Sequence, residues 1–123
     1  MLTASPDGDG QAALYRAALD MLEEPILIYD DMQVLYANYA ACRMLGGCEN
    51  MKVQGMRVQD FILPDLAEIS DVRRAYVLER GITLSNLMIK VRGLDGEPTV
   101  LRIDIRPITF EDSTAAMATL ARP

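Results

Sequence analysis

The stretch VLYANYAACRMLGG, residues 34–47, changes its pattern abruptly at Asn38. The β-branched and aromatic residues before it predict a strand, and the small residues after it predict a short helix. A strand that runs straight into a helix can carry a phosphate-binding loop or a nucleophile elbow, but both motifs need glycines at the turn. The turn here contains only Ala37, Asn38 and Tyr39. It therefore lacks the residues of either catalytic motif.

The composition indicates one globular domain with a single core, because the chain has 123 residues and 50% of them are hydrophobic. The formal net charge of −6 argues against a nucleic-acid or membrane surface, since phosphate groups are bound by clustered Lys and Arg. No apolar run is long enough to span a membrane, and no signal segment opens the chain. We therefore expect a cytoplasmic protein that binds neither nucleic acid nor membrane.

The residues of common catalytic and metal sites are missing. The chain has no His, so it can form neither a nucleophile–His pair nor a zinc site built on imidazole. Cys42 and Cys48 are expected to be ordinary, partly buried thiols rather than a disulfide or zinc ligands. The carboxylate pairs Asp30–Asp31 and Glu111–Asp112 fall at expected turns, where acidic residues are common. We expect no catalytic residue, no metal and no enzyme activity.

The first part of the chain predicts a leader followed by a helix. Residues 1–10 are rich in Gly, Asp and Pro and are expected to be disordered. Residues 11–24 predict an amphipathic helix that Pro25 stops. Two strands and a short helix are expected next, over residues 25–31, 33–38 and 39–45.

A longer helix is predicted over residues 63–81, with Gly81 as its stop. Asp65 is expected to be its N-cap because Glu68 follows three residues later, as in a capping box. The segment before this helix, residues 48–62, predicts only short helical pieces. The buried face of the long helix is expected to carry four residues: Leu66, Ile69, Val72 or Arg73, and Tyr76.

The last third of the chain predicts three antiparallel strands, over residues 82–93, 99–110 and 113–121. Asp95–Gly96 suits a hairpin turn between the first two. Apolar and charged residues alternate along them, which predicts one buried face and one wetter face. A lone hairpin is not stable, so the two earlier strands must join these three. The predicted fold class is α+β, a five-stranded antiparallel sheet with the helices gathered over one face.

Three segments of the chain carry a family resemblance. The first is EEPILIYDDMQVLYANYAACRMLG, the second GMRVQDFILPD, and the third VRGLDGEPTVLRIDIRPI. Their order and spacing resemble those of the PAS domain, with its ANxA step, its short helix before Pro-Asp and its hairpin with Asp-Gly at the turn. The resemblance covers residues 12–122, and it implies a sensor domain over residues 25–123 behind the N-terminal helix.

The resemblance also explains the break at Asn38. In this family the Asn after the second strand redirects the chain into helices that cap the sheet. Physically, an Asn side chain can hydrogen-bond nearby backbone and cap the free N–H groups of a helix. Asn38 is therefore expected to be structural, and the helical lid that it starts can leave a cavity over the sheet.

Family members bind different cofactors, and the sequence argues against several of them. Haem sensors commonly hold iron through a His on the long helix, and this chain has none. Light-sensing flavin members carry a Cys in a motif like GxNCRFLQ, and the matching stretch GMRVQDFIL has Val58 in its place. We expect no cofactor. Non-covalent flavin and an unidentified small apolar ligand both remain open.

Aliphatic, aromatic and sulfur side chains are expected to face the cavity between sheet and helices. These residues can bind a small molecule or simply fill the core, and both interpretations stay open. Tyr76 is the expected polar contact, because a buried hydroxyl needs a partner. The candidate ligand-binding residues are Ile28, Met44, Phe61, Ile69, Tyr76, Leu87, Ile89, Leu101, Ile103 and Met117.

The N-terminal helix carries an apolar stripe that can cover its own sheet or pack against a second copy. Alanines along the helix allow close approach of a partner, and PAS domains commonly dimerise through this helix. We expect a homodimer with its interface at Leu14, Ala18, Met21 and Leu22.

Two functions follow from the resemblance. The first is a bacterial sensory input domain whose ligand or dimer state controls an effector in the same parent chain, either a transcription regulator or a histidine kinase. The second is a dimerisation or interaction module that binds no ligand. The last residues, TLARP, follow the final predicted strand closely and are expected to mark a domain boundary, with the effector beyond it.

Overall fold

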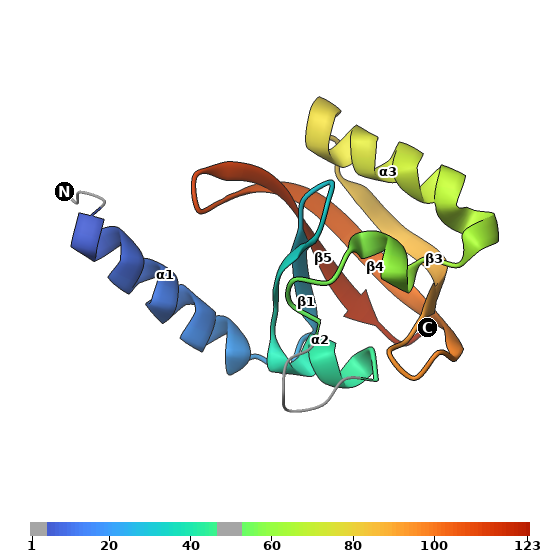
Figure 1. Cartoon of the computed structure of the whole chain (residues 1–123), viewed down its shortest axis with the longest axis horizontal. Coiled ribbons are helices and arrows are strands. Elements are labelled where there is room, and N and C mark those ends of the chain that lie inside the picture. Colours follow the sequence, from blue (N-terminus) through green and yellow to red (C-terminus); the bar gives the residue numbers. More distant parts are fainter. Residues whose placement is uncertain (1–4, 47–52) are drawn as a thin grey trace.

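The computed structural model describes residues 5–46 and 53–123, with side chains from residue 13 onward (Figure 1). Its centre is a five-stranded antiparallel sheet with the strand order β2-β1-β5-β4-β3. The two N-terminal strands therefore lie beside the last strand of the chain, which confirms that they join one sheet. The strands are β1 (Ile26–Tyr29), β2 (Val34–Ala37), β3 (Leu84–Arg92), β4 (Pro98–Phe110) and β5 (Ser113–Ala121).

The helices other than α1 form a lid over one face of this sheet, and α1 extends away from it (Figure 1). Isolated bridges from Gln33 to Arg57 and from Ile62 to Val91 attach the connecting segment to β3 and to the β1–β2 turn. This arrangement confirms the predicted α+β class. The helices are α1 (Ser5–Asp20), α2 (Tyr39–Met44) and α3 (Ala67–Arg80), with 3₁₀ turns η1 (Val58–Phe61) and η2 (Pro64–Leu66).

Asn38 ends β2 and caps α2, as the sequence predicts. Its side-chain oxygen accepts hydrogen bonds from the backbone N–H groups of Ile26 and Ala41, both at 2.9 Å. Its amide nitrogen donates to the carbonyl oxygens of Leu19 at 3.0 Å and Glu24 at 2.8 Å. Asn38 is fully buried. One side chain therefore holds the end of α1, the start of β1 and the first turn of α2 together.

The core has two parts, one on each face of the sheet. Because side chains alternate along a strand, Leu27 and Tyr29 of β1 face the lid while Ile26 and Ile28 face the other side. The lid side holds the larger cluster, to which β4 contributes Leu101, Ile103 and Ile105. The second cluster is smaller and includes Tyr36 and Ala115, with Leu19 from α1 packed against it.

Three helix boundaries differ from those that the sequence predicts. α1 begins at Ser5, inside the leader that was expected to be disordered, and it ends at Asp20, before the expected stop at Pro25. A proline in the first turn costs little, because the N–H that it lacks has no partner there. Asp65 does not cap α3: residues 64–66 form a separate 3₁₀ turn, and the N-cap is Leu66 without a side-chain bond. Gly81 does end α3, in the left-handed conformation with φ 68°.

The predicted buried face of α3 is only partly correct, since Leu66 and Arg73 are half-buried but the other residues are not. Ile69 and Tyr76 were expected to point inward, but they are 47% and 41% exposed, and Val72 is also exposed. The buried residues of the helix are Arg74 and Val77. The helix therefore presents a partly polar row to the sheet, which a packed core would not tolerate but a cavity open to solvent does.

Several smaller expectations can be compared with the structure. Gly96 turns the β3–β4 hairpin and Glu111–Asp112 turns the β4–β5 hairpin, each with positive φ. Cys42 is buried, and Cys48 lies outside the described residues. Within the described residues, no helix is long and apolar enough to cross a membrane. No group of acidic, Cys or His residues in that same part of the chain has the arrangement of a metal site.

Candidate ligand-binding site

A partly open cavity of about 80 Å³ lies between the inner face of the sheet and the lid. A water molecule needs only about 10–15 Å³, so the space can hold several waters or a small organic molecule. Its walls come from every strand of the sheet and from the lid segment between η1 and α3. The lining residues are Leu27, Tyr29, Val34, Leu45, Val58, Phe61, Ile62, Leu66, Ser70, Arg73, Arg74, Ile89, Lys90, Val91, Leu101, Ile103, Ile105, Ala118 and Leu120.

Most of this lining is apolar and buried. Phe61 of η1 and Leu101 and Ile103 of β4 belong to the lid-side core cluster and also line the cavity. Apolar walls with a few polar groups are typical of small-molecule sites, because burial supplies affinity and the polar groups orient the ligand. The polar groups here come from α3 and β1.

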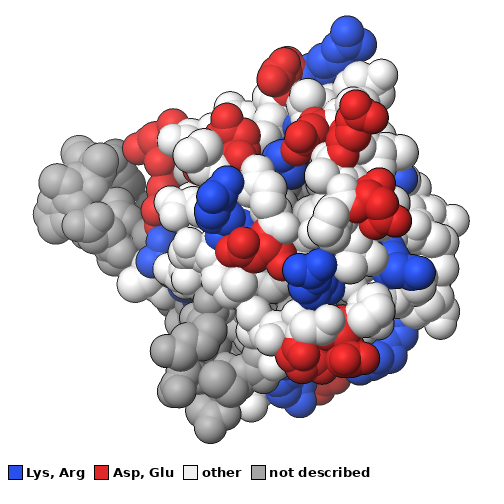
Figure 2. Space-filling model, turned by 45° about the vertical axis from the view of Figure 1, so that its right-hand side comes forward, with Lys and Arg blue, Asp and Glu red and all other residues white. Residues whose placement is uncertain are grey.

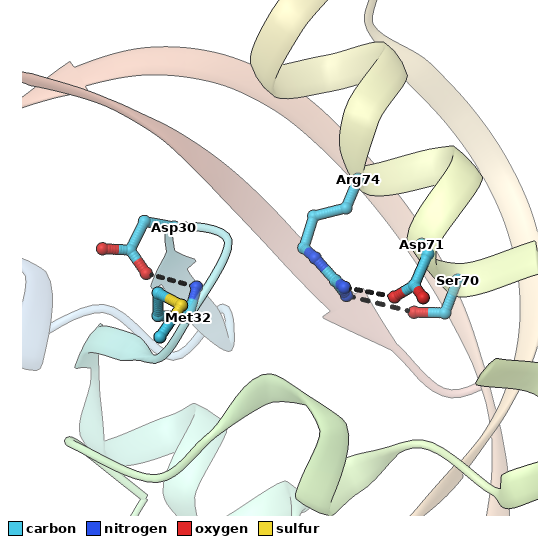
Figure 3. Close-up of polar contacts among 5 residues, drawn as sticks. All are labelled: Asp30, Met32, Ser70, Asp71 and Arg74. Atoms are coloured by element: carbon cyan, nitrogen blue, oxygen red, sulfur yellow. Dashed lines mark hydrogen bonds and ion pairs between the residues drawn. The ribbon is translucent and has the colours of Figure 1, made fainter. Parts of the chain in front are cut away.

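Arg74 is the most buried charged side chain of the described residues, with 9% of its side chain exposed. Figure 3 shows it extending from α3 with its guanidinium group beside Ser70 and Asp71 of the preceding turn. The guanidinium donates to the Ser70 hydroxyl at 3.4 Å and forms an ion pair with Asp71. Asp71 is 63% exposed, so the buried cation is balanced only by a carboxylate in water.

Tyr29 lies on β1, in the opposite wall of the cavity, and is 7% exposed. Burial raises the pKa of its phenol to about 12, and the nearby charge of Arg74 opposes that rise. The phenol is therefore protonated at neutral pH and can donate a hydrogen bond. Its hydroxyl makes no hydrogen bond to any residue that the structure describes.

The lining includes Arg73 and Lys90 as well as Arg74, but no carboxylate. Asp30, at the β1–β2 turn, bonds its own turn instead. Its side-chain oxygen accepts from the N–H group of Met32 at 2.8 Å (Figure 3) and from that of Gln33 at 2.8 Å. On the face shown in Figure 2, acidic and basic side chains are interspersed. Lys90 is exposed and alternates with the inward-facing Ile89 and Val91, so the cations beside the cavity are those of α3.

The structure brings together only some of the predicted ligand-binding residues. The four that line the cavity are Phe61, Ile89, Leu101 and Ile103. Met44 and Leu87 pack against the same core cluster but do not line the cavity.

The other predicted ligand-binding residues lie elsewhere. Ile28 and Met117 belong to the cluster on the opposite face, because the alternation along their strands was assigned to the wrong side. Ile69 and Tyr76 are on the exposed side of α3. The Tyr76 ring instead lies under the Arg80 guanidinium, at 5.3 Å.

Sequence reasoning missed Arg74, Tyr29 and Ser70. An Arg within the charged run SDVRRAY is ordinarily interpreted as a surface residue. A pattern that could have found it is the spacing of Ser70, Arg74 and Val77, which places all three on one stripe of the helix. Tyr29 alternates with Leu27 along β1, which would have placed both on the same face.

The end of α1 is attached to the sheet by polar contacts. The Tyr36 hydroxyl donates to Asp20 at 2.6 Å and to the Arg16 carbonyl at 3.0 Å. Burial and the bond to Asp20 raise the pKa of this phenol above its ordinary value. Arg16 also pairs with Glu111 at the β4–β5 turn and lies 5.8 Å from the ring centre of Phe110.

The side chains of the predicted dimer stripe, on α1 and the connection that follows it, take no part in these contacts. Its four residues are exposed in the single chain, and Met21 is 84% exposed. Leu22 lies beyond the end of α1, in the connection to β1. Dimerisation through Leu14, Ala18, Met21 and Leu22 stays a prediction.

The sequence profile of the PAS domain family matches residues 13–82. That match spans more than half of the chain, so this protein belongs to the PAS domain family. No curated protein sequence matches the chain.

Solved structures show the same fold at low sequence identity. The PAS domain of nitrogen regulation protein NR(II) from Vibrio parahaemolyticus has a TM-score of 0.68 at 22% identity, covering 89% of this chain and 98% of its own. A domain of a sensory box sensor histidine kinase/response regulator from Geobacter sulfurreducens has a TM-score of 0.69 at 17% identity, covering 92% of this chain and 94% of its own. The LOV protein of Rhodobacter sphaeroides has a TM-score of 0.69 at 19% identity, covering 91% of this chain and 66% of its own. These similarities confirm the fold.

Proposed function

We propose that this PAS domain is the sensory input domain of a signal-transduction protein, and that a small molecule in the cavity controls an attached effector. The observation that carries the proposal is a partly open cavity on the lid side of the sheet, with a buried cation in its wall. Membership in the PAS family supports a sensory role. Similar folds in proteins named as a nitrogen regulation protein and a sensor histidine kinase support an effector that is a histidine kinase or a transcription regulator.

A short covalent and hydrogen-bonded path supports transmission from the cavity to α1. Tyr29 in the cavity wall and Ile26 at the Asn38 side chain belong to the same four-residue strand. Asn38 in turn holds the carbonyl groups of Leu19 and Glu24, at the end of α1 and just after it. In our proposal, a ligand that shifts β1 therefore changes the position of α1, and through it the contact with a second copy.

We also propose that the domain acts in the cytoplasm, without enzyme activity and without haem or a covalently attached flavin. The sequence supports this part of the proposal, since it has no His and carries Val58 at the position of the flavin-reactive Cys.

A neutral apolar probe tests ligand binding. We expect 1-hexanol to shift the amide resonances of cavity residues such as Phe61 and Leu101 in a two-dimensional NMR titration. Residues of the opposite cluster outside β1, such as Ile108 and Ala115, are the internal control and should shift little. In the parent protein, Leu101→Phe should fill the cavity and change effector output, whereas exposed Met88→Ala should not. No cavity shifts and no change of output would contradict the proposal.

The second candidate is a dimerisation module that binds no ligand. The observation that favours it is the exposed apolar stripe on α1, which includes Leu14 and Met21. A dimer whose stability is the same with and without cavity-filling Leu101→Phe would favour this module over a sensor.

A further inference from the structure

Residues of only one charge border the cavity. Arg73 and Arg74 of α3 and Lys90 of β3 are in its lining, and no acidic residue is. Lys90 is exposed and lies between Ile89 and Val91, which pack on the lid side, so its side chain points to the other face of the sheet. Arg74 is the buried cation, and a buried cation in an apolar site favours an anion that comes from outside.

Arg74 is the cation that is buried deeply enough to recognise such an anion. A guanidinium has five N–H donors, and the two contacts to Ser70 and Asp71 use only part of them. Asp71 is three residues earlier on the same helix and mostly in water, so it is a weak competitor for the charge. A second anion in the cavity would meet the guanidinium where water is partly excluded and the attraction is stronger.

Tyr29 is a second, independent indication of a polar ligand group. Its side chain is more than nine-tenths buried and lines the same cavity, and its hydroxyl has no hydrogen-bond partner among the described residues. Part of the hydroxyl stays accessible from the cavity, because it is not among the fully buried polar atoms that lack a partner. A ligand that displaces water from the cavity must therefore offer this hydroxyl a hydrogen bond. Arg74 on α3 and Tyr29 on β1 thus offer donors from two walls of the same cavity, and the two oxygens of a carboxylate can accept from both.

The remainder of the cavity limits the size and character of the ligand. Phe61, Leu101 and Ile103 offer an apolar surface without further charge. A volume of about 80 Å³ is well below the roughly 300–1,000 Å³ of pockets for drug-sized molecules. The ligand must therefore combine one anionic group with a short hydrocarbon chain.

We propose that the cavity binds a short aliphatic carboxylate, with its carboxylate on Arg74 and Tyr29 and its chain among Phe61, Leu101 and Ile103. This assignment rests on the proposed sensory function, because it names the class of ligand that the cavity takes. The carboxylate replaces Asp71 as the main partner of Arg74, so binding frees the first turns of α3 from that ion pair.

Calorimetric titration of the purified chain with hexanoate tests the assignment. Hexanamide and 1-hexanol are matched neutral probes, and inorganic phosphate is an anion without a chain. We expect hexanoate to bind at least about tenfold more tightly than either neutral probe, since a charge-assisted bond is lost in them. From acetate through butanoate to hexanoate, each added methylene should strengthen binding by about fourfold, until the cavity is full.

Variants of the two anchoring residues locate the anion. Arg74→Met should weaken hexanoate by about tenfold or more while leaving 1-hexanol unchanged, and Tyr29→Phe should act in the same direction. Arg102→Met is the matched control, because Arg102 is exposed on β4 and does not line the cavity. Asp71→Asn changes an exposed side chain and should strengthen hexanoate binding, so the test does not depend on Arg74→Met folding.

The outcomes separate this inference from the proposed function. If neutral probes bind and hexanoate binds no better, the cavity takes a ligand but the carboxylate assignment is wrong. If phosphate binds as tightly as hexanoate, the carboxylate assignment is also wrong, because the hydrocarbon chain then contributes nothing to the affinity. An unchanged hexanoate affinity in both Arg74→Met and Asp71→Asn would place the anion elsewhere. If none of the probes binds, the ligand-sensing function itself fails.

Discussion

Replacing Asn38 by alanine removes four hydrogen bonds from one fully buried side chain. Two of them satisfy the backbone N–H groups of Ile26 and Ala41, which are themselves buried. An unsatisfied buried donor costs about 1–3 kcal/mol, so the two together cost about 2–6 kcal/mol. The carbonyl groups of Leu19 and Glu24 are closer to solvent and can be rehydrated. We expect the free energy of unfolding to fall by about 3 kcal/mol, more than the roughly 0.5–2 kcal/mol of an N-cap alone.

Urea denaturation followed by circular dichroism measures this loss. Asn38→Ser is the informative comparison, because serine keeps an acceptor for the N-cap bond to Ala41 but cannot reach the carbonyl groups of α1 and its connection. It should recover about 1 kcal/mol of the loss. If Asn38→Ala costs less than about 1 kcal/mol, or if the serine variant is no better than alanine, the side chain does not join α1, β1 and α2 in solution as the structure indicates.

Three further predictions can be checked on the purified chain. Burial raises the pKa of Tyr29 to about 12, above the ordinary 10.0, so the folded state loses stability as the pH rises from about 10 to about 12, and Tyr29→Phe should reduce that loss. Denaturation midpoints at pH 8 and pH 11 measure it, and an equal alkaline loss in both proteins would show that Tyr29 ionises normally. Sedimentation should find a homodimer at tens of micromolar. Leu14→Glu/Met21→Glu should convert it to monomer, whereas a double variant that stays dimeric would place the interface elsewhere. The natively purified protein should show no visible absorption, and a Soret or flavin band would refute the expected absence of both cofactors.

The sequence alone was sufficient for the fold class because its strongest patterns are local. Alternation along β4 predicts a strand with Leu101, Ile103 and Ile105 on one buried face, and the structure confirms it. The change from strand to helix at Asn38 and the stop of α3 at Gly81 follow from side-chain capping and backbone freedom, which depend on neighbouring residues only. The family resemblance rested on these same features.

Tertiary structure decided which polar side chains enter the cavity. α3 carries apolar residues on more than one face, so the helical period could not say whether Ile69 and Tyr76 or Arg74 and Val77 face the sheet. The segment around η2 sets the rotation of α3 about its own axis, and that rotation decides which residues face the sheet. The cavity also allows the Arg74 guanidinium to stay partly hydrated. Ile28 is the corresponding case in a strand. Alternation divides β1 into two faces, but only the packing of the lid determines which face lines the cavity.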